Sequence, residues 1–154
     1  MAVEIRHFRP DDIPTLVALF RDTIRRVNSR DYSPEQVRAW APDDVDPARW
    51  ATLTDRFTVV AEMGGHVAGF ADLETDGHVD RFFVHADYQR QGVGRALLAA
   101  LVAEAVRVGM GRLFAEVSIT ARPFFTRHGF SVLAEQVIQV RGVSMTNFRM
   151  ERRF

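Results

Sequence analysis

The central stretch of the sequence runs Val84-His85-Ala86-Asp87-Tyr88-Gln89-Arg90-Gln91-Gly92-Val93-Gly94-Arg95-Ala96-Leu97-Leu98. The apolar residues before it are typical of the end of a buried strand, and the apolar periodicity after it predicts a helix. Gly92 and Gly94 lack a Cβ, so the chain can turn tightly there and a ligand can approach the backbone closely. A helix that begins at this point directs its unpaired N–H groups and the positive end of its dipole into the loop, which suits phosphate. The stretch therefore predicts either an anion site, with Arg90 and Arg95 adding charge, or only a tight strand-to-helix turn.

Two common phosphate-binding signatures do not match this loop. No Gly-Lys-Ser/Thr follows the glycines, and the second half of a dinucleotide fingerprint is missing. The hexapeptide Gln89-Arg90-Gln91-Gly92-Val93-Gly94 instead resembles the Gln/Arg-x-x-Gly-x-Gly/Ala signature of the GNAT superfamily, the acyl-CoA-dependent N-acetyltransferases. A second segment, Ala121-Arg122-Pro123-Phe124-Phe125-Thr126-Arg127-His128-Gly129-Phe130, resembles the family's other landmark, an aromatic-Tyr pair before x-x-x-Gly-Phe. We therefore expect a single N-acetyltransferase domain over residues 1–154.

The composition limits the chemistry and the setting. The chain has 154 residues, of which 47% are hydrophobic, and 20 basic residues balance 20 acidic ones, so no overall field favours nucleic acid. No apolar run could span a bilayer and no signal-peptide pattern is present, so we expect a cytoplasmic protein without a membrane partner. The absence of Cys excludes disulfides, thiolate metal sites and a cysteine acyl-enzyme, and the absence of Lys excludes Schiff-base chemistry. We expect direct transfer without a metal, and the sequence leaves a homodimer open.

Alternating and helical apolar periods, with turn residues between them, predict an α+β domain. Gly64-Gly65 is a favoured hairpin turn between two of the strands, and Ser33 can cap a short helix. The expected elements are a strand containing Val3 and Ile5, a helix capped by Asp11 or Asp12, a helix Pro34–Trp40, strands Phe57–Met63, His66–Leu73 and His78–Val84, a helix Val93–Val108, a strand Leu113–Val117, a helix Ala121–Arg127, and strands Phe130–Val140 and Ser144–Met150. The strands should form a central, mainly antiparallel mixed sheet flanked by helices, and the strand–helix–strand unit around the glycine loop should give a parallel pair. The resemblance implies a GNAT-like fold in which these two parallel strands splay apart and form the acyl-CoA cleft.

The resemblance also implies how acetyl-CoA would be held. Backbone amides of the loop would bind the pyrophosphate, and the backbone of the strand before it would pair with the pantetheine arm, with an amide near Val84 facing the thioester oxygen. Ser118 stands where many members have Asn, and it can still bond the arm. Phe125 stands where many members have the Tyr that protonates the leaving thiolate, and Phe cannot donate a proton. Thr120 or Tyr88 could donate instead, or the thiolate, whose thiol has a pKa of ~8.5, could leave without an acid. The predicted cofactor residues are Phe82, Phe83, Val84, Gln89, Arg90, Gln91, Gly92, Val93, Gly94, Arg95, Ala96, Ser118 and Phe125.

Acetyl transfer to an amine also calls for a base. A free aliphatic amine has a pKa of ~10.4, so near neutral pH it must lose a proton before it can attack. Strand alternation places His78 and Asp80 on the face of Phe82 and Val84. In several relatives the base is a Glu six residues before the Val84 position, where this chain has His78, a side chain that ordinarily titrates near neutrality. His78 and Asp80 are our candidate catalytic residues, and Glu62, Asp72 and Glu116 remain open.

The acceptor is not identified by any motif. The segment Asp31-Tyr32-Ser33-Pro34-Glu35-Gln36-Val37-Arg38-Ala39-Trp40 resembles one bacterial branch of the superfamily, in which it covers the acceptor site. Asp43, Asp44 and Asp46 could attract a cationic acceptor or could simply be solvated. We expect a small-molecule amine acceptor. The alternative is a non-catalytic acyl-CoA-binding sensor or interaction domain, which the loss of the usual Tyr would suit.

Overall fold

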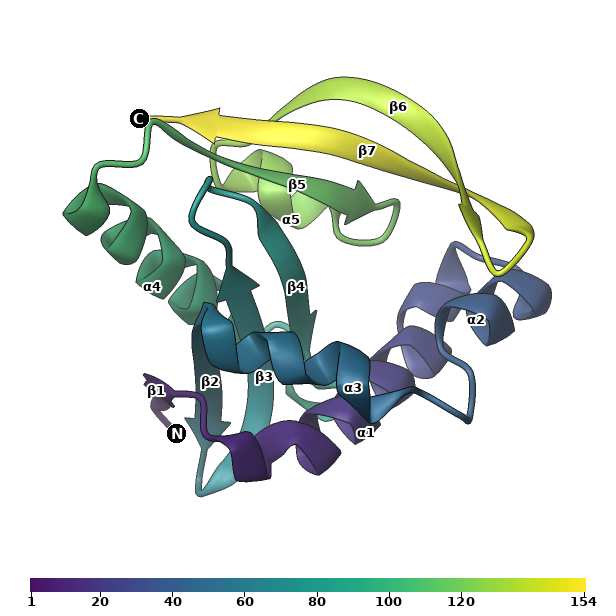
Figure 1. Ribbon diagram of the computed structural model, residues 1–154, viewed down its shortest axis with the longest axis horizontal. Helices are drawn as coiled ribbons and strands as arrows, with labels where there is room; N and C mark the ends of the chain where they lie inside the picture. Colours follow the sequence, from purple (N-terminus) through teal and green to yellow (C-terminus); the bar gives the residue numbers. More distant parts are fainter.

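Two antiparallel sheets organise the chain in this computed structural model, which describes residues 1–154 apart from the side chain of Pro47. The first has the order β1-β2-β3-β4, with bounds Val3–His7, Phe57–Met63, His66–Leu73 and Val79–Val84. The second has the order β5-β7-β6, with bounds Arg112–Ser118, Val143–Arg153 and Ser131–Val140. One parallel bridge, between His78 and Phe114, joins the sheets where β4 and β5 begin. Beyond it the two strands diverge (Figure 1), as the predicted splayed pair requires.

Helices cover both faces of the first sheet. The helices are α1 (Ile13–Arg26), α2 (Pro34–Trp40), α3 (Pro47–Trp50), α4 (Val93–Val108) and α5 (Arg122–Arg127), with single 3₁₀ turns at Pro10–Asp12, Asn28–Arg30, Ala51–Asp55 and Ala86–Tyr88. Along β2, Val60 packs with Leu16 of α1, whereas Val59 belongs to the core cluster that contains Leu97 of α4. Burial on both faces explains why β2 and β3 are apolar almost throughout.

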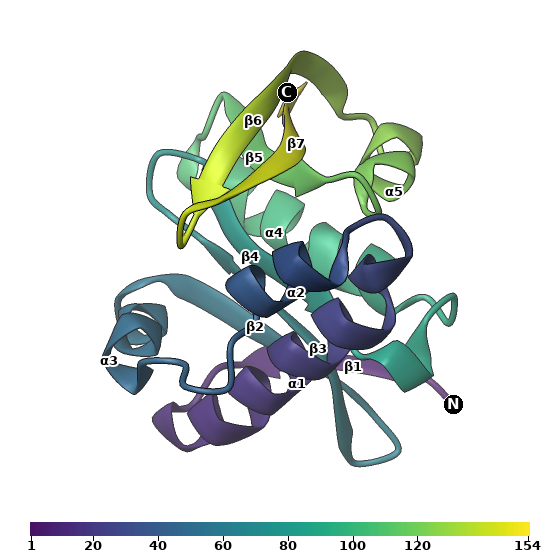
Figure 2. The ribbon, with the colours of Figure 1, turned by 90° about the vertical axis from the view of Figure 1, so that its right-hand side faces the viewer.

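The second helix lies between α1 and the β6–β7 hairpin, as Figure 2 shows. The Ser33 hydroxyl accepts from the Gln36 N–H while the Gln36 side chain accepts from the Ser33 N–H, so a complete capping box begins α2 at Pro34, as predicted. The Tyr32 hydroxyl donates to the Thr146 carbonyl at 2.7 Å and accepts from the Ile119 N–H at 2.9 Å. These bonds fix the start of α2 against the second sheet.

The predicted cap of α1 differs in detail. Asp12 does occupy the N-cap position, but its carboxylate makes no capping bond to the helix. It accepts two hydrogen bonds from the Arg6 guanidinium, at 2.8 and 2.9 Å, and one from the Arg9 N–H. The pKa of Asp12 is lowered, and the main cause is its hydrogen bonding with Arg6. A nearby guanidinium has outcompeted the helix terminus for this carboxylate.

A β-bulge in β4 overturns the predicted alternation of that strand. Ala71 of β3 pairs with Phe82 and Leu73 with Val79, so two steps along β3 oppose three along β4. Val79 and Phe82 consequently pack into the same core cluster. The prediction that His78, Asp80, Phe82 and Val84 share one face by simple alternation is therefore wrong.

Among the residues that the structure describes, no helix is both long and apolar enough to cross a membrane.

Candidate active site

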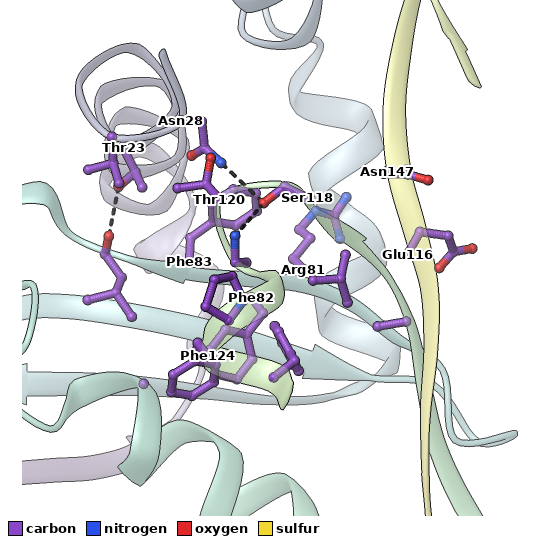
Figure 3. A pocket seen from close by; sticks show the side chains of 18 of the residues that line it. Thr23, Asn28, Arg81, Phe82, Phe83, Glu116, Ser118, Thr120, Phe124 and Asn147 are labelled. Atoms are coloured by element: carbon purple, nitrogen blue, oxygen red, sulfur yellow. Dashed lines mark hydrogen bonds between the residues drawn. The ribbon is translucent and has the colours of Figure 1, made fainter. Parts of the chain in front are cut away.

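A cavity of about 1050 Å³ lies where β4 and β5 diverge. Its walls come from β4, β5, the glycine loop with the start of α4, and α5, and on the other side from α1, α2 and the β6–β7 hairpin. Figure 3 shows side chains around it from α1, β4, β5, α5 and β7. The cavity is continuous from the glycine loop to α2. A ligand bound at the loop and a second ligand near α2 could therefore contact each other inside it.

The glycine loop begins α4 at one end of the cavity. Gly92 is the N-cap residue with a φ of 87°, and Arg90 has a φ of 61°, so both lie in the left-handed region that favours glycine. Within the described part of the chain, no atom lies within 4 Å of the point where a Cβ on Gly92 would stand. A Cβ on Gly94 would instead stand 3.0 Å from the Phe124 ring. Gly94 therefore also allows α5 to pack against the start of α4, a role that the sequence pattern did not indicate.

Most of the predicted loop residues lie at the cavity. Those that line it are Gln89, Arg90, Gly92, Val93, Gly94 and Arg95. Gln91 and Ala96 lie outside the lining. The Ala96 N–H donates to the Gly92 carbonyl as the first bond of the helix, so it is no free donor, and the Gln91 side chain donates to the Asp87 carbonyl. The Ala96 N–H is thus unavailable to a phosphate, and Gln91 lies outside the lining of the cavity.

The end of β4 forms the wall beside the loop. Phe82, Phe83 and Val84 all line the cavity. The His85 N–H donates to the Ala68 carbonyl of β3, so alternation directs the N–H and C=O groups of Val84 to the opposite, open side. The Val84 carbonyl there accepts from Thr23 Oγ1 at 3.0 Å and from Gln89 Nε2 at 2.9 Å. The Val84 N–H therefore faces the open edge of β4, beside the cavity that Val84 lines.

Two hydroxyls lie at the cavity wall, one on the last residue of β5 and one just after that strand. Ser118 Oγ accepts from the Ala121 N–H at 3.0 Å and from Asn28 Nδ2 at 3.3 Å, so its own hydrogen can point into the cavity (Figure 3). Thr120 also lines the cavity, and among the described side chains its Oγ1 is a buried polar atom without a hydrogen-bond partner. Both side chains are therefore placed to bond a ligand in the cavity.

Phe125 lines the cavity but belongs chiefly to the core. Its side chain is 3% exposed and packs edge-on against Phe82, Phe124 and Phe130, with ring centroids 5.0 to 5.3 Å apart. Phe124 is the more exposed of the pair and stacks on His128. The ring of Phe125 therefore supplies an apolar surface and no proton.

His78 does not meet the expectation for a free base. It lies outside the lining of the cavity. Its Nε2 is 2.6 Å from Glu116 and its Nδ1 is 2.7 Å from Glu74, and these bonds, that to Glu116 first, raise its pKa to about 9. An imidazole that keeps its proton at neutral pH cannot accept another, so the expected titration near neutrality is wrong.

Two of the candidate carboxylates line the cavity, Asp80 and Glu116. Asp80 accepts a hydrogen bond from Arg56 Nη1 at 2.5 Å. Glu116 is hydrogen-bonded to His78, and this bond is the main cause of the lowered pKa of Glu116. The other two carboxylates that the sequence left open are engaged elsewhere. Glu62 accepts from Arg6, and the fully buried Asp72 accepts from Arg56 and from the side chain and N–H of Arg81.

The wall opposite the loop is apolar and comes from elements far apart in the sequence. Trp40 and Tyr32, which sequence reasoning had singled out, lie here, whereas Trp50 packs in a separate cluster with Leu16 and Phe70. Sequence reasoning missed the rest of the wall: Phe20, Ile138, Val140 and Met145. Alternation marks one face of β6 and β7, but it does not show which part of the molecule that face meets.

Comparisons with known proteins agree on the family. The acetyltransferase (GNAT) domain model matches residues 28–152. The uncharacterized N-acetyltransferase YafP of Escherichia coli (strain K12) is 35% identical over 149 residues, which are 96% of this chain and 94% of that protein.

Solved structures give the same result. The GCN5-related N-acetyltransferase from Rhodopseudomonas palustris superposes with a TM-score of 0.95 at 30% identity, over 100% of this chain and 97% of that one. The PaiA N-acetyltransferase from Thermoplasma acidophilum, in complex with coenzyme A, superposes with a TM-score of 0.80 at 18% identity over the whole of both chains. With the splayed strands and the glycine loop at the cavity, these matches establish that the chain belongs to the GNAT superfamily of N-acetyltransferases and is an acyltransferase.

Proposed function

We propose that the chain transfers the acetyl group of acetyl-CoA directly to the amine of a small molecule. The observation that carries this proposal is the continuous cavity between β4 and β5, with the start of α4 at one end and a separate apolar wall at the other. Such a cavity can hold a donor and an acceptor in register, which is the main contribution to a two-substrate transfer. The fold likeness to a structure in complex with coenzyme A supports the choice of donor.

The donor would lie along the glycine loop and β4. The N–H groups of Gly92, Val93, Gly94 and Arg95 are the first of α4, so they have no partner within the helix and can bind the pyrophosphate. The pantetheine arm would run along Phe82, Phe83 and Val84, opposite the hydroxyl of Ser118. These residues all line one cavity, so a single extended molecule can reach each of them.

The chemistry follows from this placement. The neutral amine attacks the thioester carbonyl carbon, a C–N bond forms, and the Val84 N–H is positioned to stabilise the oxyanion. The C–S bond then breaks and coenzyme A leaves as a thiolate. A thiol has a pKa of ~8.5, so this leaving group is tolerable without the acid that Phe125 cannot supply. The proton of the amine would pass to Asp80 or Glu116, directly or through water.

The test is thiol release from acetyl-CoA in the presence of a panel of primary amines. Turnover that depends on an amine, with the acetylated amine detected by mass spectrometry, is the expected result. Acetyl-CoA binding by calorimetry without turnover on any amine would instead support a non-catalytic acyl-CoA-binding domain. Failure to bind acetyl-CoA would remove the proposed donor.

A further inference from the structure

We propose that the acceptor carries one primary amine on an aromatic or bulky apolar body, an inference that rests on the proposed function. It excludes polyamines and aminoglycosides as preferred substrates. The proposal stands on two features of the acceptor end of the cavity: an exposed apolar wall and a nearly neutral cluster of charged side chains beside it.

The apolar wall presents rings that the side chains described by the structure cover only in part. Phe20 and Trp40 of this wall are only partly buried. The Phe83 ring of β4, which packs against both, is also partly buried, and all three rings line the cavity. Phe20 and Phe83 meet edge to face with centroids 5.0 Å apart, and Trp40 lies 6.4 Å from Phe83. Apolar surface inside a cavity is stabilised when a ligand displaces water from it. An apolar or aromatic body is the occupant that gains from this wall.

The wall is held rigidly before any ligand arrives. Arg141 Nη1 donates to the Ala39 carbonyl, and Gln36 Nε2 donates to the Ser144 carbonyl. The Tyr32 hydroxyl, two residues before α2, donates to the Thr146 carbonyl, so α2 and the residues just before it are tied to the β6–β7 hairpin at three points. A rigid ligand loses little conformational entropy when it binds a preformed pocket, whereas a flexible chain loses more. The pocket therefore favours a compact ring over a flexible chain.

The charged cluster beside the wall leaves little charge for the acceptor. It consists of the carboxylates of Asp72, Glu74, Asp80 and Glu116, the guanidiniums of Arg56 and Arg81, and the protonated imidazole of His78. Of these groups only Asp80, Glu116 and Arg81 line the cavity, so two carboxylates face it beside one guanidinium, and one ammonium balances the remaining negative charge. The additional ammonium groups of a polycation would face the apolar wall without partners, which is costly.

Two of the three aspartates that precede α3, Asp43 and Asp46, are also engaged. Asp43 accepts from Arg25 at 2.7 Å, and Arg21 donates to the Asp43 carbonyl. The Asp46 carboxylate accepts from the Ala48 N–H at the start of α3. The aspartates of this segment therefore offer a polycation less than the sequence alone suggested.

The experiment compares 2-phenylethylamine and tryptamine with spermidine and kanamycin. Wild-type protein should show a kcat/KM at least about 30-fold higher for the two arylalkylamines, roughly the discrimination that an apolar pocket can provide. Two neighbouring residues of β6 make a matched pair, because Ile138 lines the cavity while Val137 is 67% exposed and lies outside its lining. Ile138→Ala should raise the KM for 2-phenylethylamine several-fold and leave acetyl-CoA affinity unchanged, and Val137→Ala should change neither. Trp40→Ala should act as Ile138→Ala does, and Trp40→Phe should restore most of the loss.

The outcomes separate this inference from the proposed function. A higher kcat/KM for spermidine or kanamycin would overturn the acceptor class while leaving the acetyl transfer intact. Equal effects of Ile138→Ala and Val137→Ala would overturn the role of the wall. Calorimetry with 2-phenylethylamine added to the protein saturated with coenzyme A tests binding without turnover: saturable binding that Ile138→Ala weakens supports the inference, and its absence overturns it.

Discussion

His78 Nε2 lies 2.6 Å from Glu116 Oε2, across the point where β4 leaves β5. The His78 backbone forms the parallel bridge with Phe114, and its ring stacks on the ring of Phe114 with centroids 5.1 Å apart. The pair therefore closes the narrow end of the divergent strands and fixes the carboxylate of Glu116, which lines the cavity. His78 acts on the site through Glu116 and the strand geometry.

The first prediction is that His78 makes stability depend on pH. Its pKa is raised to about 9 from 6.5, so its stabilising contribution is complete below pH 6.5 and is lost as pH rises through 9. The pKa shift sets an upper limit of about 3 kcal/mol on the fall in the free energy of unfolding over this window. The actual fall should be smaller, because Glu74 and Glu116 are partly exposed and solvent screens their interaction with His78. Urea unfolding at pH 6 and at pH 9.5 measures the fall, and His78→Gln serves as the control that lacks it. An equal fall in both proteins would contradict the raised pKa.

The second prediction concerns the base. Asp80→Ala should lose rate mainly at low pH and recover at high pH, where the amine is already neutral, because the variant lacks only the group that removes a proton. His78→Ala should keep the low-pH limb of the wild-type profile, since its imidazole is already protonated there. The pH dependence of kcat/KM for a turned-over amine decides this. If Asp80→Ala retains the wild-type profile, Asp80 is not the base, and Glu116→Gln is the next variant to measure.

The third prediction concerns the glycine loop. Gly94→Val should weaken acetyl-CoA binding by ~2 kcal/mol or more, roughly thirtyfold in affinity, because a side chain there obstructs the approach to the first turn of α4. Gly111→Ala is the matched control, since the described chain leaves the space around its Cβ open and it lies beyond the other end of α4. Calorimetry measures both affinities.

A displaced Phe124 ring could weaken binding in the same variant, because that ring lies 3.0 Å from the added Cβ of residue 94. Combining Gly94→Val with Phe124→Leu gives the ring position a smaller, more flexible side chain. Affinity that stays low in the double variant assigns the loss to obstruction of the cofactor. A return to wild-type affinity would mean that Gly94 serves the packing of α5 alone.

The fourth prediction is that Phe125 shapes the cavity and keeps water out of it, without donating a proton. Phe125→Tyr should leave kcat unchanged or raise it by up to ~10-fold, since a placed acid gives more only when its partners are matched to it. Phe125→Leu, which keeps most of the apolar volume, should raise the KM for acetyl-CoA with a small loss of stability. Steady-state kinetics, with thermal unfolding as the check on folding, measures both. A collapse of kcat in folded Phe125→Tyr with intact cofactor affinity would show that the acceptor occupies the space beside the ring.

Where a signal is local, the sequence predicted the structure closely. Gly64-Gly65 between two apolar runs gave the β2–β3 hairpin with the observed bounds, because few other residues adopt the positive φ of 58° and 81° found there. The Ser33 capping box gave the start of α2, and the apolar period gave α4 from Val93 to Val108. Each of these features depends on interactions between residues only a few positions apart in the sequence.

Predictions that assumed an unbroken local pattern were less successful. Alternation along β4 failed at the bulge opposite Leu73 and Ala71, because an extra residue in one strand is settled by how that strand packs against its neighbour. The Ala96 N–H is not free, because it donates the first hydrogen bond of α4 to the Gly92 carbonyl. The sequence motif ends at Gly94 and does not show where that first bond forms.

The sequence by itself determined the family, the strand–loop–helix that opens the cavity, and the chemistry that a chain without Cys or Lys cannot perform. Only the tertiary structure decided the state of His78, because its two carboxylate partners come from the turn before it and from β5, 38 residues away. Only the tertiary structure assembled the acceptor wall, because Phe20, Trp40, Phe83 and Ile138 belong to four elements that meet only when the chain folds. Local order follows from neighbouring residues, whereas protonation and pocket shape depend on side chains that folding alone brings together.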